Sequence, residues 1–175
     1  MYIFLIIVVL IIILLVFLYN RIVSLNLRCK NAWASIDNQL KRRADLIPNL
    51  VEVTKEYAKY ESETLEQLVL ARNESITDKA RQSEEISKNL NKLLALTENY
   101  PELKASELFQ NLQIELIGTE DKIAYARQFY NDTVQHFNTT IMMFTNNIFA
   151  SILKFEQKEY FKVSDEDKKR VDVKL

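Results

Sequence analysis

The sequence has few residues that end or bend secondary structure, with one glycine and two prolines among 175 residues. A β-rich fold needs many turns, and turns depend heavily on Gly and Pro. Their scarcity excludes a sandwich or barrel and favours long helices. The predicted fold class is therefore all-α.

Charged side chains are absent from the first nineteen residues, MYIFLIIVVLIIILLVFLY, which also lack Gly and Pro. At 1.5 Å per residue this stretch reaches roughly 28 Å, close to the ~30 Å hydrocarbon core of a bilayer. It has no polar helix face, no basic leader region and no small residues before a cleavage point, because Asn20 and Arg21 follow directly. We expect an uncleaved transmembrane anchor at 1–19 that contacts the lipid bilayer.

Basic residues lie on one side of this anchor only. Six follow it between positions 21 and 43, and Arg21, Arg28 and Lys30 are close enough to influence membrane insertion. The other side offers only the α-amino group. The asymmetry predicts a single-pass protein with its N-terminus outside and the rest of the chain cytoplasmic.

The sequence is also poor in the residues that carry chemistry. One histidine, His136, without a glutamate three residues before it cannot supply a di-iron bundle site or a nucleophilic triad. One glycine excludes a phosphate-binding loop, and the single Cys29 excludes an intramolecular disulfide. With 23 basic and 24 acidic residues there is no basic field for nucleic acid. We predict no enzyme activity, no metal, no cofactor and no nucleic-acid partner.

Apolar residues recur at helical spacing along the rest of the chain. No Gly or Pro interrupts Met1 to Ala44, so the anchor is expected to continue into the first bundle helix. Its stripe Ile22, Leu25, Cys29, Ala32, Ile36, Leu40 should be buried. Pro48 should then break the helix, with Asp45 as the N-cap of the next one.

The pattern predicts further helices at 48–73 and 78–99, and a long fourth helix. The fourth helix should bury Leu108, Leu112, Leu116, Thr119, Ile123, Ala126, Tyr130, Val134, Phe137, Ile141 and Phe144. These helices predict an elongated antiparallel four-helix bundle over residues 20–145. Gly118 is expected where another chain segment approaches closely. Residues 146–175 should form a short amphipathic helix and an extended or disordered tail.

Two polar segments are candidate sites, KRRADLIPN at 41–49 and GTEDKIAYARQFYN at 118–131. One interpretation is structural: Arg42 or Arg43 pairs with acids across the bundle, while Tyr130 and Asn131 satisfy polar groups at the Pro48 break. The other is a surface that binds a partner. The candidate residues are Arg42, Arg43, Asp45, Pro48, Asn49, Gly118, Thr119, Glu120, Arg127, Tyr130 and Asn131.

The sequence resembles the LemA family of bacterial membrane proteins. The likeness rests on YNRIVSLN after the anchor, AWASIDNQLKRRADLIPNLVE, GTEDKIAYARQFYN, FNTTIMMF and EYFKV. Departures are mild: Glu56 and Lys154 replace usual glycines, Thr145 a common proline and Tyr60 a common histidine. The resemblance implies a single span and a four-helix bundle at the bacterial inner membrane, with a membrane protease or TPM-domain protein as partner.

Three functional hypotheses follow. The leading one is a membrane-anchored scaffold or adaptor in envelope quality control. The alternative is a protein that contacts or shapes the bilayer surface, through Arg21, Arg28 and Lys30 and the amphipathic 148–155 segment. An enzyme using the KRRAD segment at 41–45 and Arg127 is the third. The sequence leaves the partner and the oligomeric state open.

Overall fold

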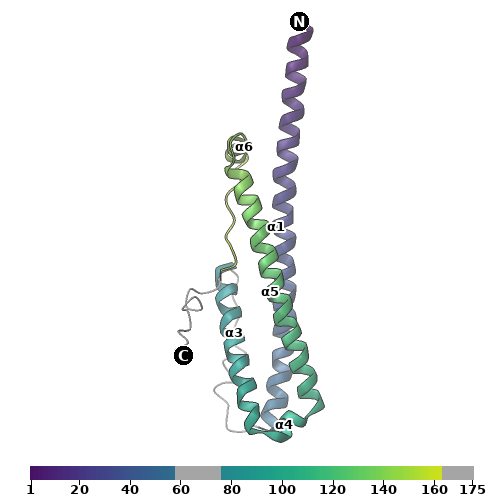
Figure 1. Ribbon diagram of the computed structural model, residues 1–175, viewed down its shortest axis with the longest axis vertical. Helices are drawn as coiled ribbons and strands as arrows, with labels where there is room; N and C mark the ends of the chain where they lie inside the picture. The colour runs from purple at the N-terminus through teal and green to yellow at the C-terminus, as the bar shows by residue number, and fades with distance from the viewer. Residues whose placement is uncertain (58–75, 163–175) are drawn as a thin grey trace, which may run out of the picture. The chain divides into compact units, whose positions relative to one another are not determined.

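A computed structural model of the chain describes residues 1–57 and 76–162. Every regular element in these two ranges is helical and none is a strand, so the predicted all-α class is confirmed (Figure 1). The elements are α1 (Tyr2–Tyr57), α3 (Ile76–Leu96), the 3-10 helix η1 (Thr97–Asn99), α4 (Pro101–Ala105), α5 (Glu107–Met142) and α6 (Asn146–Ile152).

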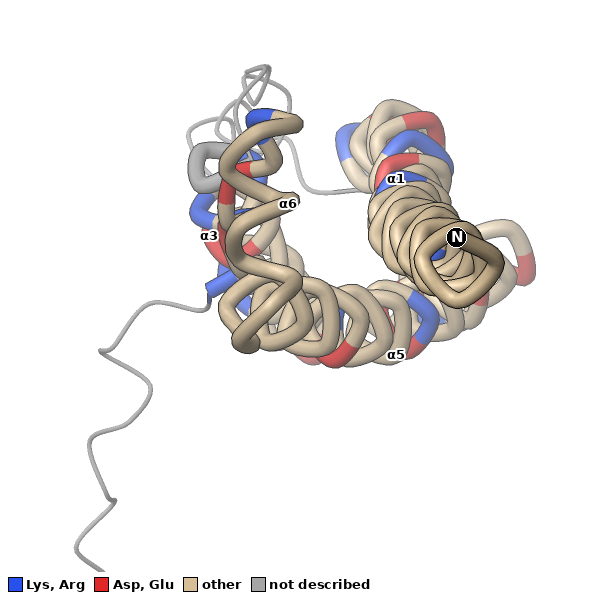
Figure 2. Tube along the Cα trace, turned by 90° about the horizontal axis from the view of Figure 1, so that it is seen from above, with Lys and Arg blue, Asp and Glu red and all other residues tan. Residues whose placement is uncertain are grey.

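Helix α1 begins as the predicted apolar segment and continues without a break for 56 residues. Residues 1–17 are all exposed, and Leu18 is the first buried side chain. Seen end-on in Figure 2, the turns nearest the N-terminus carry no acidic or basic colouring. By length and composition this part of α1 can cross a membrane.

The predicted helix break at Pro48 is wrong, because α1 passes through Pro48 and ends at Tyr57. A proline inside a helix costs roughly 3 kcal/mol through its lost hydrogen bond and its clash with the preceding turn. Burial of Ile47, Leu50 and Val51 around it contributes roughly 1.5 to 3 kcal/mol each, so packing outweighs the local cost. Asp45 accordingly lies inside a helix and is no N-cap.

The predicted helix at 48–73 therefore does not begin at Pro48, and residues 58–73 of it lie outside the described residues. The helix predicted at 78–99 is confirmed as α3 followed by η1. The all-helical architecture stands, while the count of four helices in one bundle stays a prediction.

The chain divides into two compact units, which we describe separately. Unit 1 comprises residues Met1–Ile36 and Ala126–Tyr160, and unit 2 comprises Asp37–Tyr125 and Phe161–Leu175. Helices α1 and α5 each contribute one part to unit 1 and another to unit 2.

In unit 1, α1 and α5 pack side by side in antiparallel directions. The Cys29 thiol lies 3.6 Å from the carbonyl oxygen of Thr133, and the Trp33 ring meets Tyr130 edge-to-face. Helical spacing predicts the buried residues of this unit correctly. They are Ile22, Leu25, Cys29, Ala32 and Ile36 on α1, and Ala126, Tyr130, Val134, Phe137 and Ile141 on α5.

Unit 2 has its own apolar core. Its buried members come from four helices: Ile47, Leu50, Val51 and Val53 on α1, Leu90 and Leu93 on α3, Leu103 on α4, and Phe109, Leu112 and Leu116 on α5. Pro101 takes the first turn of α4, where its missing N–H is tolerated.

Two members of the predicted stripe on the fourth helix are wrong. Leu108 is 59% exposed and Phe109 is buried instead, because α4 is a separate short helix and α5 starts afresh at Glu107. Phe144 is 86% exposed, because α5 ends at Met142 before reaching it.

A short helix, α6, follows residue 145. The chain then runs back beside α5 without regular structure (Figure 1). We call residues 155–160 the strap. It is extended and hydrogen-bonded to α5. Residues 163–175 of the predicted tail lie outside the described ranges.

Candidate functional site

The two polar segments singled out in the sequence meet in unit 2 at Arg43. Its position follows from helical spacing, because Ile36, Leu40, Arg43 and Ile47 step by four, three and four along α1 and share one face. The side chain is 2% exposed, and its Nη1 lies 2.8 Å from Glu120 Oε2 on α5. Arg43 and Glu120 therefore pair between two helices.

Two serines of α3 complete the surroundings of the guanidinium. Arg43 Nη2 donates to Ser83 Oγ at 2.8 Å and to the Ser83 carbonyl at 3.2 Å, and Nη1 donates to Ser87 Oγ at 3.1 Å. Ser87 Oγ also lies 2.7 Å from Glu120 Oε1 and 2.9 Å from the Ser83 carbonyl. One cation thus joins α1, α3 and α5.

Ser83 and Ser87 are site residues that were not predicted from the sequence. A signal existed: they are four residues apart, and each lies three residues before an inward position of the same helix, Ile86 and Leu90. Hydroxyls at such positions on an otherwise apolar stripe indicate a buried polar partner.

The arrangement around Arg43 is suited to holding helices together. Arginine stays protonated, so it cannot serve as a base, and both serine hydroxyls accept hydrogen bonds from the cation. Nucleophilic serine chemistry requires an adjacent base. His136 is exposed on α5, in unit 1. Within residues 1–57 and 76–162, no group of three His, Cys, Asp or Glu side chains could hold a metal.

Further ion pairs surround the Arg43 cluster. Asp37 lies 2.6 Å from Lys79 Nζ and 3.3 Å from Lys41 Nζ. The hydrogen bond from Lys79 lowers the pKa of Asp37 below its ordinary value; the bond from Lys41 and both positive charges add to this, while partial burial opposes it. Arg42 reaches Glu115 at 3.8 Å, with both side chains half exposed. Such a surface pair contributes about 0 to 1 kcal/mol.

Other predicted site residues have ordinary helix environments. Asp45, Pro48 and Asn49 are exposed on α1, and Thr119 is buried with its hydroxyl donating to the Glu115 carbonyl at 2.7 Å. A Cβ atom added to Gly118 would meet nothing within 4 Å, so the expected close approach is wrong.

Tyr130 belongs to unit 1, and its predicted role at the Pro48 break is wrong. Its hydroxyl donates to the Glu159 carbonyl of the strap at 2.9 Å, and its ring centroid lies 5.6 Å from that of Trp33. Burial raises the pKa of Tyr130 to about 12, with Cys29 and Glu159 adding to the effect. Arg127 and Asn131, nearby on α5, are half-buried.

Asn138, which was not predicted from the sequence, holds the strap with two hydrogen bonds. Its Nδ2 donates to the Lys158 carbonyl and its Oδ1 accepts from the Lys158 amide, both at 2.9 Å. The buried amide thereby pairs with the strap backbone as a neighbouring strand would. The Lys158 ammonium lies 5.3 Å from the centre of the Phe137 ring, which also meets Phe155 edge-to-face.

A groove lies between α3 and α5 in unit 2, with a volume of about 240 Å³. Leu90, Leu94 and Ile117 give it an apolar lining, and Glu120 and Asp121 lie at its rim. Ile117 is half exposed, so the groove opens to solvent. Apolar concavities with a few polar groups are common binding sites.

The chain matches a known protein family over most of its length. A profile of the LemA family matches residues 32–175. The chain is 28% identical to Protein LemA of Metamycoplasma hominis over 150 residues, which cover 82% of this chain and 68% of that protein.

The chain is also similar to magnetosome proteins. It is 32% identical over 72 residues to Magnetosome protein MamQ 2 of Paramagnetospirillum magneticum, covering 41% of this chain and 26% of that protein. Magnetosome protein MamQ of Magnetospirillum gryphiswaldense is 29% identical, with the same coverage. The match therefore spans about a quarter of the length of these magnetosome proteins. None of the names denotes an enzyme.

Proposed function

The chain belongs to the LemA family, and from this premise we propose that it is a membrane-anchored scaffold or adaptor that binds another protein. The observation that carries the proposal is the groove between α3 and α5, in a chain whose N-terminal helix can cross a membrane. The main polar cluster is engaged in joining helices, which supports an architectural role over a catalytic one.

The groove suggests the chemistry of the partner. Its apolar lining would accept Leu- or Ile-like side chains at helical spacing, as helix-binding grooves do. Glu120 is already paired with Arg43, whereas Asp121 is exposed on the rim and would attract a basic residue. We therefore propose an amphipathic, partly basic helix as the bound segment. A membrane protease or a TPM-domain protein is the class of partner that the family resemblance implies.

We also propose the bacterial inner membrane as the location, with the N-terminus outside and the chain after the span cytoplasmic. Exposed Arg21, Arg28 and Lys30 directly after the span support this orientation. A thiol introduced by Lys92→Cys in a Cys29→Ala chain should react with an impermeant reagent only after the membrane is opened. Labelling of this thiol in intact cells would contradict the proposed orientation and indicate the opposite one.

Photo-crosslinking from the groove tests the scaffold role. A p-benzoylphenylalanine placed at Ile117, on the groove wall, should form an adduct with another protein in native membranes. The same photoreactive group at the exposed Glu85 of α3 is the matched control and should form none.

Mass spectrometry would identify the adduct. If position 117 captures only lipid or further copies of this chain, the scaffold proposal is overturned. A second variant, Ile117→Glu, should abolish recovery of the captured partner while leaving the protein folded, because Ile117 is half exposed.

A further inference from the structure

Large apolar side chains are exposed where α5 turns into α6. We call residues 142–153 the corner. Phe144 is 86% exposed and Ile152 is 70% exposed, and Met142, Met143, Ile148 and Leu153 are each exposed to about half. Exposed apolar side chains gathered over so short a stretch indicate a surface that another apolar phase covers.

The corner is also free of charge. Residues 133–153 contain no Asp, Glu, Lys or Arg, in a chain of which 27% is charged. Inside the corner, Asn146 and Ala150 of α6 are buried, and Asn146 Nδ2 donates to the Thr140 carbonyl at 3.0 Å. Ile148 and Ile152 lie four residues apart on the opposite, exposed face of α6. This is the pattern of a helix that lies on a membrane.

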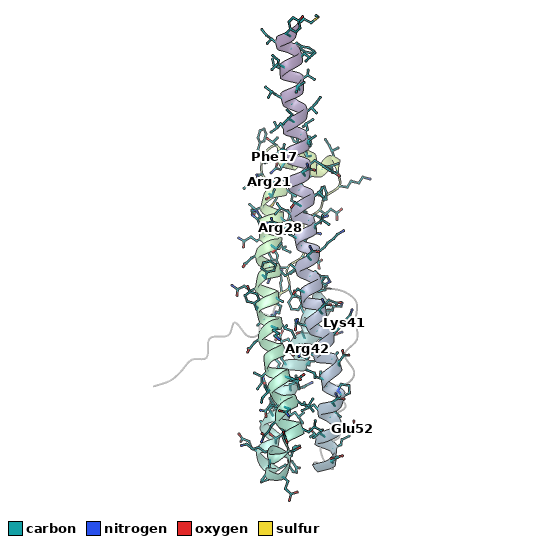
Figure 3. The ribbon with its side chains drawn as sticks, turned by 90° about the vertical axis from the view of Figure 1, so that its right-hand side faces the viewer. Phe17, Arg21, Arg28, Lys41, Arg42 and Glu52 are labelled. Atoms are coloured by element: carbon teal, nitrogen blue, oxygen red, sulfur yellow. The ribbon has the colours of Figure 1, made fainter. Side chains whose placement is uncertain are left out.

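The position of the corner in unit 1 suggests which surface covers it. Cys29 lies against Thr133, and both helices rise about 1.5 Å per residue in opposite directions. Leu18 is eleven residues before Cys29 on α1, and Phe144 is eleven residues after Thr133. The two residues therefore lie at about the same level along the axes of the paired helices. Leu18 is where protein cover on α1 begins and the fully exposed apolar span ends. In Figure 3 the yellow-green ribbon of α6 lies level with Phe17 and Arg21.

Positive side chains border the corner. Arg21 is exposed one helical turn beyond Leu18. Lys154 closes α6 in the left-handed conformation, with φ 56°, while the Phe155 amide donates to the Ala150 carbonyl at 2.8 Å. Glycine normally occupies this position of a helix C-terminus. A lysine here places a cation beside the apolar face, where lipid phosphate groups would lie.

We propose that the corner is a second membrane contact, in which Phe144, Ile148 and Ile152 enter the interfacial layer of the bilayer beside the point where α1 leaves it. Arg21 and Lys154 contact lipid phosphates at the same level. The span and the corner together fix unit 1 against the membrane at two places. This inference concerns lipid alone and does not depend on the protein partner proposed above.

Fluorescence quenching by lipid tests the contact in the full chain. Trp33→Phe removes the native indole, and Phe144→Trp then provides a single reporter in vesicles of phosphatidylcholine and phosphatidylglycerol whose acyl chains carry bromine. Phe17→Trp in the span is the positive control. Phe129→Trp is the matched negative control, because Phe129 on α5 is exposed as Phe144 is. It lies fifteen residues before Phe144, which at 1.5 Å per residue is about 20 Å further from the membrane.

The indole at position 144 should be quenched nearly as strongly as that at position 17, and the indole at 129 should be unaffected. Equal, weak quenching at 144 and 129 would overturn the proposal. Because Trp33→Phe removes the contact with Tyr130, a second measurement keeps Trp33: p-benzoylphenylalanine at 144 should form lipid adducts, and at 129 none. Protein adducts at 144 without lipid adducts would equally overturn it.

Discussion

In unit 1, two neutral side chains of α5 bond to the backbone of the strap, whereas in unit 2 a charged side chain joins three helices. In unit 1, Tyr130 and Asn138 bond to the backbone of the strap. In unit 2, Arg43 joins three helices through Glu120 and two serines. The Tyr130 and Asn138 bonds to the strap thus need no ionised side chain, while the Arg43 cluster depends on a carboxylate to balance a buried cation.

The largest expected effect concerns that cation. Glu120→Ala should lower the free energy of unfolding of unit 2 by about 3 to 5 kcal/mol, because it leaves a buried guanidinium without its counter-ion. Hydrogen exchange of the α3 amides in detergent micelles measures the change. Exchange around Val134 and Phe137 in unit 1 should stay as it is.

Glu115→Ala is the matched control on the same helix, since the pair of Glu115 with Arg42 is exposed. It should change stability by no more than about 0.5 kcal/mol. Similar losses for both variants would show that the Arg43 pair is no more important than a surface pair. The double change Arg43→Met with Glu120→Leu should recover most of the loss, because it removes both charges together.

A smaller effect is expected from the neutral bonds of unit 1. Asn138→Ala leaves the amide and the carbonyl of Lys158 without partners, which should cost about 1 to 3 kcal/mol. The loss should be local, so exchange at the Lys158 amide should accelerate while the α3 amides keep their protection. The neighbouring exposed Thr139→Ala is the control, and equal acceleration in both variants would remove the special role of Asn138.

The two units should respond to opposite extremes of pH. The pKa of Asp37 is lowered, so its stabilisation of unit 2 is complete above the ordinary value of 3.8 and is lost as the pH falls below it. Burial raises the pKa of Tyr130 from 10.0 to about 12 and also raises that of Cys29 from 9.0. The neutral forms stabilise unit 1, so this contribution is complete below about pH 9 and is lost as the pH rises above it.

Amide hydrogen exchange measured over a range of pH separates the two responses, after correction for the pH dependence of the exchange rate of unprotected amides. Asp37→Asn should remove part of the acid sensitivity of unit 2 and leave unit 1 unaffected. Tyr130→Phe should remove the alkaline titration near pH 12 from the tyrosinate absorbance. Identical pH profiles for the two units would contradict the contrast between them.

Periodicity predicted much of this fold because packing at helical spacing is a local property. The buried faces of α1 from Ile22 to Ile36 and of α5 from Leu112 to Ile141 follow from it directly. It also explains why Arg43, and not Arg42, turns inward, since Arg43 continues the stripe of Ile36 and Leu40. The error at Pro48 arose because a local rule was applied where tertiary packing decides.

The contacts that close each unit could not be predicted from spacing. The spacing of Ser83 and Ser87 puts them beside the inward positions of α3, but it could not identify the distant Arg43 as the side chain that they bond. Asn138 bonds to backbone atoms of the strap, and backbone atoms carry no sequence signature. Phe144 has the spacing of a core residue, yet α5 ends before it, so its exposure depends on where the helix stops.

The smallest expected effect is a gain of stability at the end of α6. Lys154 has a positive φ, which costs a non-glycine residue about 1 to 2 kcal/mol. Glycine avoids this cost, but the larger conformational entropy that it loses on folding costs about 0.5 to 1 kcal/mol. Lys154→Gly should therefore stabilise the turn by about 0.5 kcal/mol and slow exchange of the Phe155 amide, which bonds to Ala150. Lys154→Ala removes the same charge but keeps a Cβ, so it should give no gain. If alanine stabilises as much as glycine does, the lysine charge and not its backbone conformation is what costs unit 1 stability.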